Sequence, residues 1–139
     1  MKILFGLLSI AYITVIFLYA DSSLARDLGA FNPYSLLHIP LYGILSLLLF
    51  LSIAPPNVVR TTGGNVSVRM PQINTRLYCL IVGLIGLGVA VSDEYYQSFV
   101  PGRHASVGDV VLDLIGIILS MLLTLRFYKN YSARHGFQQ

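Results

Sequence analysis

Charged side chains are scarce in this chain. Only 11% of its 139 residues are charged and 55% are hydrophobic, which gives a mean hydropathy of +0.73. Soluble domains carry about 25% charged residues, so the composition excludes an ordinary water-soluble fold and indicates a membrane protein. A chain of this length forms a single domain, predicted to cover residues 1–139.

Cysteine is almost missing as well. The one cysteine, Cys79, lies inside an apolar run. This excludes a disulfide within the chain and a metal site built from several thiolates, so Cys79 is interpreted as a small core residue. The net charge is only +3, and in a membrane protein a basic balance reflects cytoplasmic loops rather than a nucleic-acid partner.

Long apolar runs are what the sequence has in abundance. A bilayer is crossed by about 20 apolar residues. Four runs reach or approach that length: Ile3–Ala20, Leu36–Ala54, Leu77–Val91 continued through Asp93-Glu94, and Ser106 to about Phe127. They predict an all-α membrane protein, a four-transmembrane-helix bundle. Gly83, Gly86 and Gly88 in the third run offer a smooth face to a neighbouring helix.

The first run has an alternative interpretation, a signal peptide, because Leu18-Tyr19-Ala20 resembles a cleavage site. Its length favours a retained helix. After it, Ser23–Leu28 is predicted as a short interfacial helix. Between the second and third runs, β-branched residues flank Gly-Gly-Asn within Val58–Arg69. This pattern favours a small cytoplasmic β-hairpin, with a disordered loop as the alternative.

Basic residues divide unequally between the two ends of such a bundle. Seven lie on the side of the chain ends: Lys2, Arg60, Arg69, Arg76, Arg126, Lys129 and Arg134. Arg26 and Arg103 lie on the other side. The positive-inside rule therefore predicts both termini in the cytoplasm, and all six acids then fall on the outer half.

Polar residues of three predicted helices gather at this outer face. They are His38 and Tyr42; Asp93, Glu94 and Gln97; Asp109 and Asp113; and Arg103 in the turn after Pro101-Gly102. Each set within a helix has i,i+3 or i,i+4 spacing and shares a face. Isolated charges at this depth are costly, so His38, Glu94 and Asp109 are expected to lie within one shared cavity.

Structural roles are the alternative interpretation of each residue. Ser106 is a predicted N-cap, with Asp109 in capping-box position and beside the positive helix end. His38 alone suits a satisfied interior histidine, and Arg103 suits a counter-ion for the acids. The aromatic residues Tyr34, Tyr95, Tyr96 and Phe99 are typical of an interfacial belt.

The polar pattern resembles a known family. Asp93-Glu94-x-x-Gln97-x-Phe99-Val100-Pro101-Gly102-Arg103-x-x-Ser106-x-x-Asp109, followed by Gly116, is similar to the signature of the VanZ-like family, as is His38-Ile39-Pro40-Leu41-Tyr42. Asp113 stands where that pattern has an asparagine. The resemblance implies a small bacterial inner-membrane protein linked to resistance to the glycopeptide teicoplanin, and it carries no defined reaction.

Two function classes follow. In the first, an outward site binds or modifies the head group of an envelope lipid or glycolipid. Glu94 or Asp109 would be the general base, and His38 would be the acid or its partner. Arg103 would anchor a phosphate or carboxylate, and Gln97 and Tyr42 would orient the substrate. The acids Asp93, Glu94, Asp109 and Asp113 would be the ligands of a weakly held divalent cation. In the second class, a non-enzymatic accessory protein uses the cluster structurally.

Two further functions fit the sequence less well. A proton or ion pathway needs a polar route inward, and Gly116–Leu125 offers only Ser120 and Thr124. A CDP-alcohol phosphotransferase shares the Asp109-x-x-x-Asp113 spacing but requires upstream Asp-Gly and Ala-Arg elements that this chain lacks.

Overall fold

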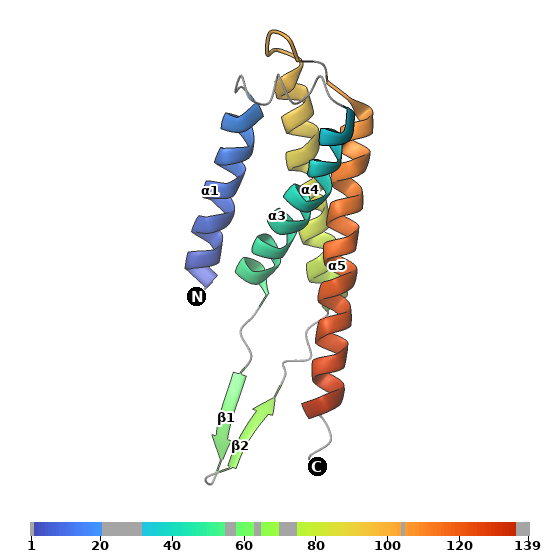
Figure 1. Ribbon diagram of the computed structural model, residues 1–139. Coiled ribbons are helices and arrows are strands. Elements are labelled where there is room, and N and C mark those ends of the chain that lie inside the picture. The colour runs from blue at the N-terminus through green and yellow to red at the C-terminus, as the bar shows by residue number, and fades with distance from the viewer. Residues whose placement is uncertain are drawn as a thin grey trace.

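The computed structural model describes residues 2–20, 32–54, 58–62, 65–69, 75–103 and 105–135. Its elements are α1 (Lys2–Ala20), the 3-10 helix η1 (Asn32–Leu37), α3 (His38–Ile53), strands β1 (Val58–Thr62) and β2 (Asn65–Arg69), α4 (Thr75–Gln97) and α5 (Val107–His135), as Figure 1 shows. The short helix predicted over Ser23–Leu28 lies outside the described residues.

Four helices within the described residues are long and apolar enough to cross a membrane. The apolar stretches cover Lys2–Ala20, Ser35–Ile53, Thr75–Gln97 and Val107–Phe127. This confirms the predicted helical, multi-pass architecture. α4 continues through the acids to Gln97, so the polar residues at its end belong to the helix and do not form a loop.

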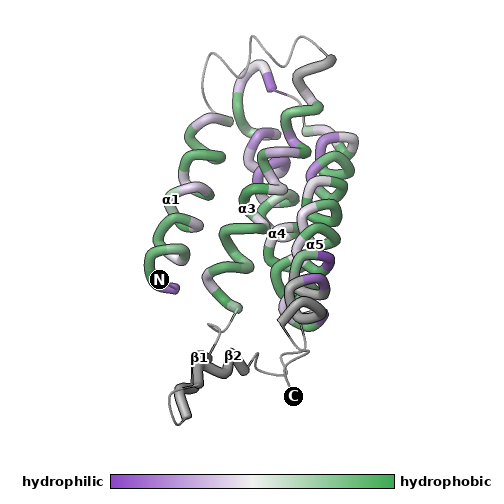
Figure 2. Tube along the Cα trace, turned by 60° about the horizontal axis from the view of Figure 1, so that its bottom comes forward, coloured by the Kyte–Doolittle hydropathy of each residue, from purple (hydrophilic) through white to green (hydrophobic). Residues whose placement is uncertain are grey.

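Most of the apolar surface faces outward. Only 17% of the α1 stretch and 28% of the α5 stretch are buried within the chain, and Leu18 and Leu123 are both 69% exposed. Figure 2 shows hydrophobic residues along the lengths of the helices and hydrophilic residues gathered near their ends. Such a surface suits a lipid environment, because lipid tails are as apolar as leucine and exposing leucine to them costs no free energy of solvation.

Helix α3 packs against α1, α4 and α5, most extensively against α5. Tyr42, Leu45 and Phe50 of α3 are buried with Val82 of α4 and Ile117 of α5. The start of α1, the end of α3 and the end of α5 lie at one end of the bundle, and η1 lies at the other (Figure 1). At the first of these ends, Lys2 Nζ lies 3.4 Å from the Ile53 carbonyl oxygen.

Glycine permits the closest helix contact. A Cβ at Gly116 would overlap the carbonyl oxygen of Ile39 and lie 2.9 Å from the carbonyl carbon, so α5 approaches the first turn of α3 backbone to backbone. On α4, Gly86 faces the neighbouring helix as predicted: a Cβ at Gly86 would lie 3.1 Å from Ile117 Cδ1 of α5. The prediction for Gly88 was wrong: among the described residues nothing lies within 4 Å of its Cβ position, because it faces outward.

Strands β1 and β2 connect α3 to α4. They pair antiparallel, with Val58 opposite Arg69 and Thr62 opposite Asn65. Figure 1 places them beyond the end of the bundle that holds the start of α1, far from η1.

Candidate functional site

The first turn of α3 supplies a histidine and a tyrosine to one face. His38 and Tyr42 are one turn apart, and their rings are stacked with centroids 6.5 Å apart and planes 5° from parallel. Tyr42 is completely buried, whereas His38 is half-buried. The two rings are thus parallel, and the imidazole is directed toward α5.

An acid of α5 binds that imidazole. His38 Nδ1 lies 2.8 Å from Asp113 Oδ1, and Asp113 is completely buried. This pair is possible because Gly116, one turn further along α5, lets the two backbones meet next to His38. The glycine contact therefore positions the site as well as the helices.

The end of α4 supplies three buried polar side chains. Asp93, Glu94 and Gln97 are 2%, 5% and 4% exposed. The Gln97 amide Nε2 donates to Asp93 Oδ2 at 3.1 Å and, more weakly, to Glu94 Oε1 at 3.4 Å. The i,i+4 spacing from Asp93 and the i,i+3 spacing from Glu94 together place a neutral donor between two carboxylates.

The turn between α4 and α5 is tightly defined. Val100-Pro101-Gly102-Arg103 has the features of a type II turn: proline second, glycine third at φ 80°, and a hydrogen bond from Arg103 N to Val100 O of 3.1 Å. Arg103 is half-buried, and its charge lies close enough to act on Asp93. The turn thus returns the chain toward the acids of α4.

Ser106 joins the two helices. Its hydroxyl accepts a hydrogen bond from Asp109 N at 3.3 Å, which confirms the predicted N-cap of α5. The predicted capping box was wrong, because the Ser106 amide donates to Glu94 Oε2 of α4 at 2.7 Å and not to Asp109. Glu94 of α4 thus accepts the hydrogen bond that Asp109 would accept in a capping box. The Asp109 carboxylate can therefore face the site.

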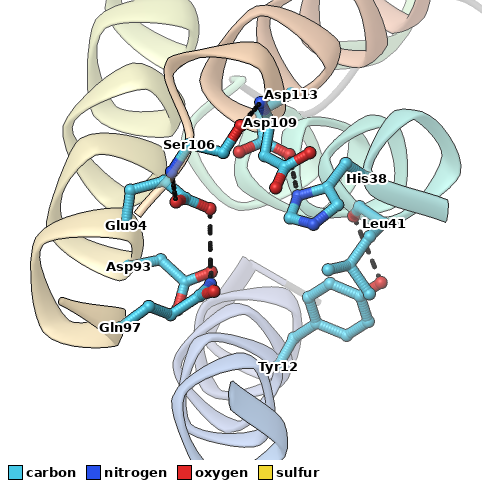
Figure 3. Close-up of polar contacts among 9 residues, drawn as sticks. All are labelled: Tyr12, His38, Leu41, Asp93, Glu94, Gln97, Ser106, Asp109 and Asp113. Atoms are coloured by element: carbon cyan, nitrogen blue, oxygen red, sulfur yellow. Dashed lines mark hydrogen bonds and ion pairs between the residues drawn. The ribbon is translucent and has the colours of Figure 1, made fainter. Parts of the chain in front are cut away.

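Three helices converge at this point. His38 of α3, Glu94 of α4 and Asp109 of α5 each place one nitrogen or oxygen within 4.8 Å of the others. Figure 3 shows these side chains directed toward one another, with Asp113 behind His38 and with Asp93 and Gln97 beside Glu94. The arrangement combines acid, base and hydrogen-bond acceptor in one polar cluster, which we define as His38, Asp93, Glu94, Gln97, Asp109 and Asp113.

Comparison with protein families decides the classification. A family model described as VanZ/LLP1 matches residues 3–128, nearly the whole chain. The chain belongs to the VanZ/LLP1 family. No curated protein and no solved structure matches it at a significant level.

The VanZ/LLP1 chain brings together most of the residues singled out from sequence. His38, Glu94 and Asp109 meet directly, Asp113 binds His38, and Gln97 binds Asp93 and Glu94. Tyr42 is buried beside Asp93. The predicted cation ligands were four acids, whereas the grouping with metal-binding geometry combines two of those acids with His38.

Sequence reasoning missed two partners in this VanZ/LLP1 bundle. One is the Ser106 amide, which no side-chain pattern reveals. The other is Tyr12 of α1, whose hydroxyl donates to the Leu41 carbonyl at 3.1 Å, close to the cluster in Figure 3. A tyrosine in the middle of an apolar run was the available signal.

The aromatic residues around the turn lie outside the polar cluster. Tyr95 and Phe99 are 68% and 67% exposed, with ring centroids 5.0 Å apart. Tyr96 contacts Phe17 of α1 edge to face at 5.7 Å. The described rings therefore line the outer surface at this end, and the side chain of Tyr34 lies outside the described residues.

Proposed function

We propose that this VanZ/LLP1 protein binds the head group of an envelope lipid or glycolipid and acts in tolerance of glycopeptides such as teicoplanin. The observation that carries the proposal is the convergence of His38, Glu94 and Asp109 from three helices. Ionisable residues within a membrane protein are costly and mark functional sites. This cluster lies near helix ends, the depth at which lipid head groups lie.

The charge distribution supports a site on the outer leaflet. The excess of lysine and arginine at the opposite end of the bundle favours a cytoplasmic location for that end. In this orientation Arg103 anchors a phosphate or carboxylate through its planar fork. Glu94 or Asp109 accepts a proton, His38 donates one, and Gln97 and Tyr42 orient the bound group.

Two conservative substitutions test the proposal. Arg103→Lys keeps the charge but loses the bidentate geometry, and Glu94→Gln keeps the shape but loses the base. We expect cells that carry either variant to lose most of the teicoplanin tolerance conferred by the wild-type protein. Tolerance is measured as the inhibitory concentration at equal membrane abundance of each protein.

Arg126→Lys is the matched control for the arginine substitution. Arg126 is exposed on α5, 17 residues beyond Asp109, which is about 25 Å along a helix. It is expected to keep full tolerance. Full tolerance in both Arg103→Lys and Glu94→Gln would contradict the proposal.

A structural cluster is the second candidate function, and the internal hydrogen bonds favour it. Gln97 binds two acids, Glu94 binds the Ser106 amide, and Asp113 binds His38, so much of the cluster satisfies itself. A non-enzymatic accessory protein would use these bonds to hold three helices together. Normal function of both test variants would select this candidate.

A further inference from the structure

The polar cluster contains the donor set of a transition-metal site. His38 offers an imidazole nitrogen, and Glu94 and Asp109 offer one carboxylate oxygen each, all within 4.8 Å of one another. Zinc sites with three protein ligands of this type leave a fourth position open for water or substrate. An imidazole among the donors favours zinc-class ions over Mg²⁺ and Ca²⁺, which prefer oxygen alone.

Asp113 fixes the imidazole in the orientation that metal binding uses. Its Oδ1 lies 2.8 Å from His38 Nδ1, so Nε2 is the ring nitrogen left for an ion. Metal-binding histidines usually donate their second N–H to a carboxylate in this way. Asp113 Oδ2 is buried and has no hydrogen-bond partner among the described residues.

Charge gives an independent reason for a cation here. Asp93, Glu94 and Asp113 are all at most 5% exposed, and Asp109 lies beside them. His38 lies among these acids and Arg103 lies close to Asp93, so four ionised acids would exceed the charge of these two basic residues. A bare acidic cluster would also repel an anionic head group, whereas a divalent ion would attract one.

The distances suit a site that tightens around its ion. Tetrahedral zinc with ligands about 2.1 Å away places them about 3.4 Å apart, so the groups must close by up to about 1.4 Å. Small rotations of Asp109 shorten its distances to His38 and Glu94, because its carboxylate is half-buried and is not used in the N-cap, and His38 and Glu94 must also approach each other. Glu94 stays bonded to Ser106 and Gln97, since each carboxylate oxygen carries a second lone pair.

We propose that His38, Glu94 and Asp109 bind one zinc-class divalent ion, with Asp113 orienting His38 and the open coordination position receiving a phosphate oxygen of a lipid head group. The phosphate part rests on the proposed function, whereas the metal site stands by itself. The competing explanation is that shared protons neutralise the acids and no metal binds.

Metal binding by the purified protein decides between the two. The full chain in detergent micelles is stripped with EDTA and titrated with Zn²⁺ by calorimetry. We expect one Zn²⁺ per chain for the wild type. His38→Gln, Glu94→Gln and Asp109→Asn are expected to bind at least about 10-fold more weakly, and Asp113→Asn about 10- to 100-fold more weakly.

Ser98→Ala is the control, because Ser98 is exposed just after the end of α4 and its hydroxyl bonds only the Tyr95 carbonyl among the described residues. It is expected to bind Zn²⁺ like the wild type. A second measurement needs no variant: Zn²⁺ raises the Tm of the stripped wild-type protein, and Mg²⁺ at the same concentration does not. No stoichiometric binding and no rise in Tm, or equal binding by His38→Gln, would overturn the metal site.

The two proposals fail separately. If Zn²⁺ does not bind but Arg103→Lys still loses teicoplanin tolerance, the metal site is wrong and head-group binding stands. If Zn²⁺ binds in the 1:1 ratio but Arg103→Lys and Glu94→Gln keep tolerance, the metal site stands and the proposed function is wrong. Inorganic phosphate that binds only the zinc-loaded protein supports the open coordination position; equal binding to the stripped protein contradicts it.

Discussion

At the scale of single residues, Glu94 has two tasks. One carboxylate oxygen accepts the Ser106 amide at the start of α5, and the other faces Gln97. The sequence predicted the Ser106 cap and the Asp93–Gln97 pair, because both depend on spacing within one helix. It did not predict the Glu94–Ser106 bond or the His38–Asp113 pair, because partners 12 and 75 residues apart meet only after the helices pack.

The two tasks of Glu94 can be separated by mutation. Glu94→Gln retains an amide oxygen that accepts the Ser106 N–H, so we expect its thermal stability to stay close to that of the wild type. Glu94→Ala leaves the amide without this acceptor and is expected to lower the free energy of unfolding by about 1–3 kcal/mol. Thermal melts in detergent, followed by circular dichroism, measure both. Equal melting of the two variants would contradict the capping role.

At the scale of helices, the sequence located the membrane segments but not their faces. Run length was sufficient because bilayer thickness fixes how many apolar residues a span needs. Helical periodicity was of little use, since lipid is as apolar as the interior and both sides of a helix carry leucine and isoleucine. The error over Gly88 has a different origin: Gly86 and Gly88 are two residues apart, which is about 200° around the helix, so the two glycines cannot share a face.

Gly116 makes the most sensitive helix contact. In Gly116→Ala the new methyl group would overlap the Ile39 carbonyl, so α3 and α5 must separate near His38 and Asp113. We expect a loss of about 1–3 kcal/mol in the free energy of unfolding, the usual cost of overpacking. The comparison is made by thermal melts at matched protein and detergent concentrations.

Gly88→Ala is the control, because the Cβ position at Gly88 has no described neighbour within 4 Å. Alanine there is expected to be neutral or stabilising by up to about 1 kcal/mol, since it favours the helix. Unchanged stability in Gly116→Ala would show that the helices do not approach as closely as described.

At the scale of the whole molecule, the 7 to 2 division of basic residues predicts the orientation in the membrane. We expect a cysteine at Ser67 in β2 to react only with reagents that reach the cytoplasm, and a cysteine at Ser22 to react with impermeant reagents from outside. Both are made in a Cys79→Ala background and labelled in intact cells. The reverse pattern would place the polar cluster at the cytoplasmic face and contradict a site in the outer leaflet.

The contact of Gly116 with Ile39 also has a consequence for how this sequence can change over generations. Any side chain at position 116 would meet a backbone carbonyl, so no substitution there is silent. Exposed positions such as Leu18 and Leu123 need only remain apolar, and drift among Leu, Ile, Val and Phe costs them little. Descendants of one ancestral chain can therefore come to differ over most of their surface while a single glycine continues to hold the histidine against its acid.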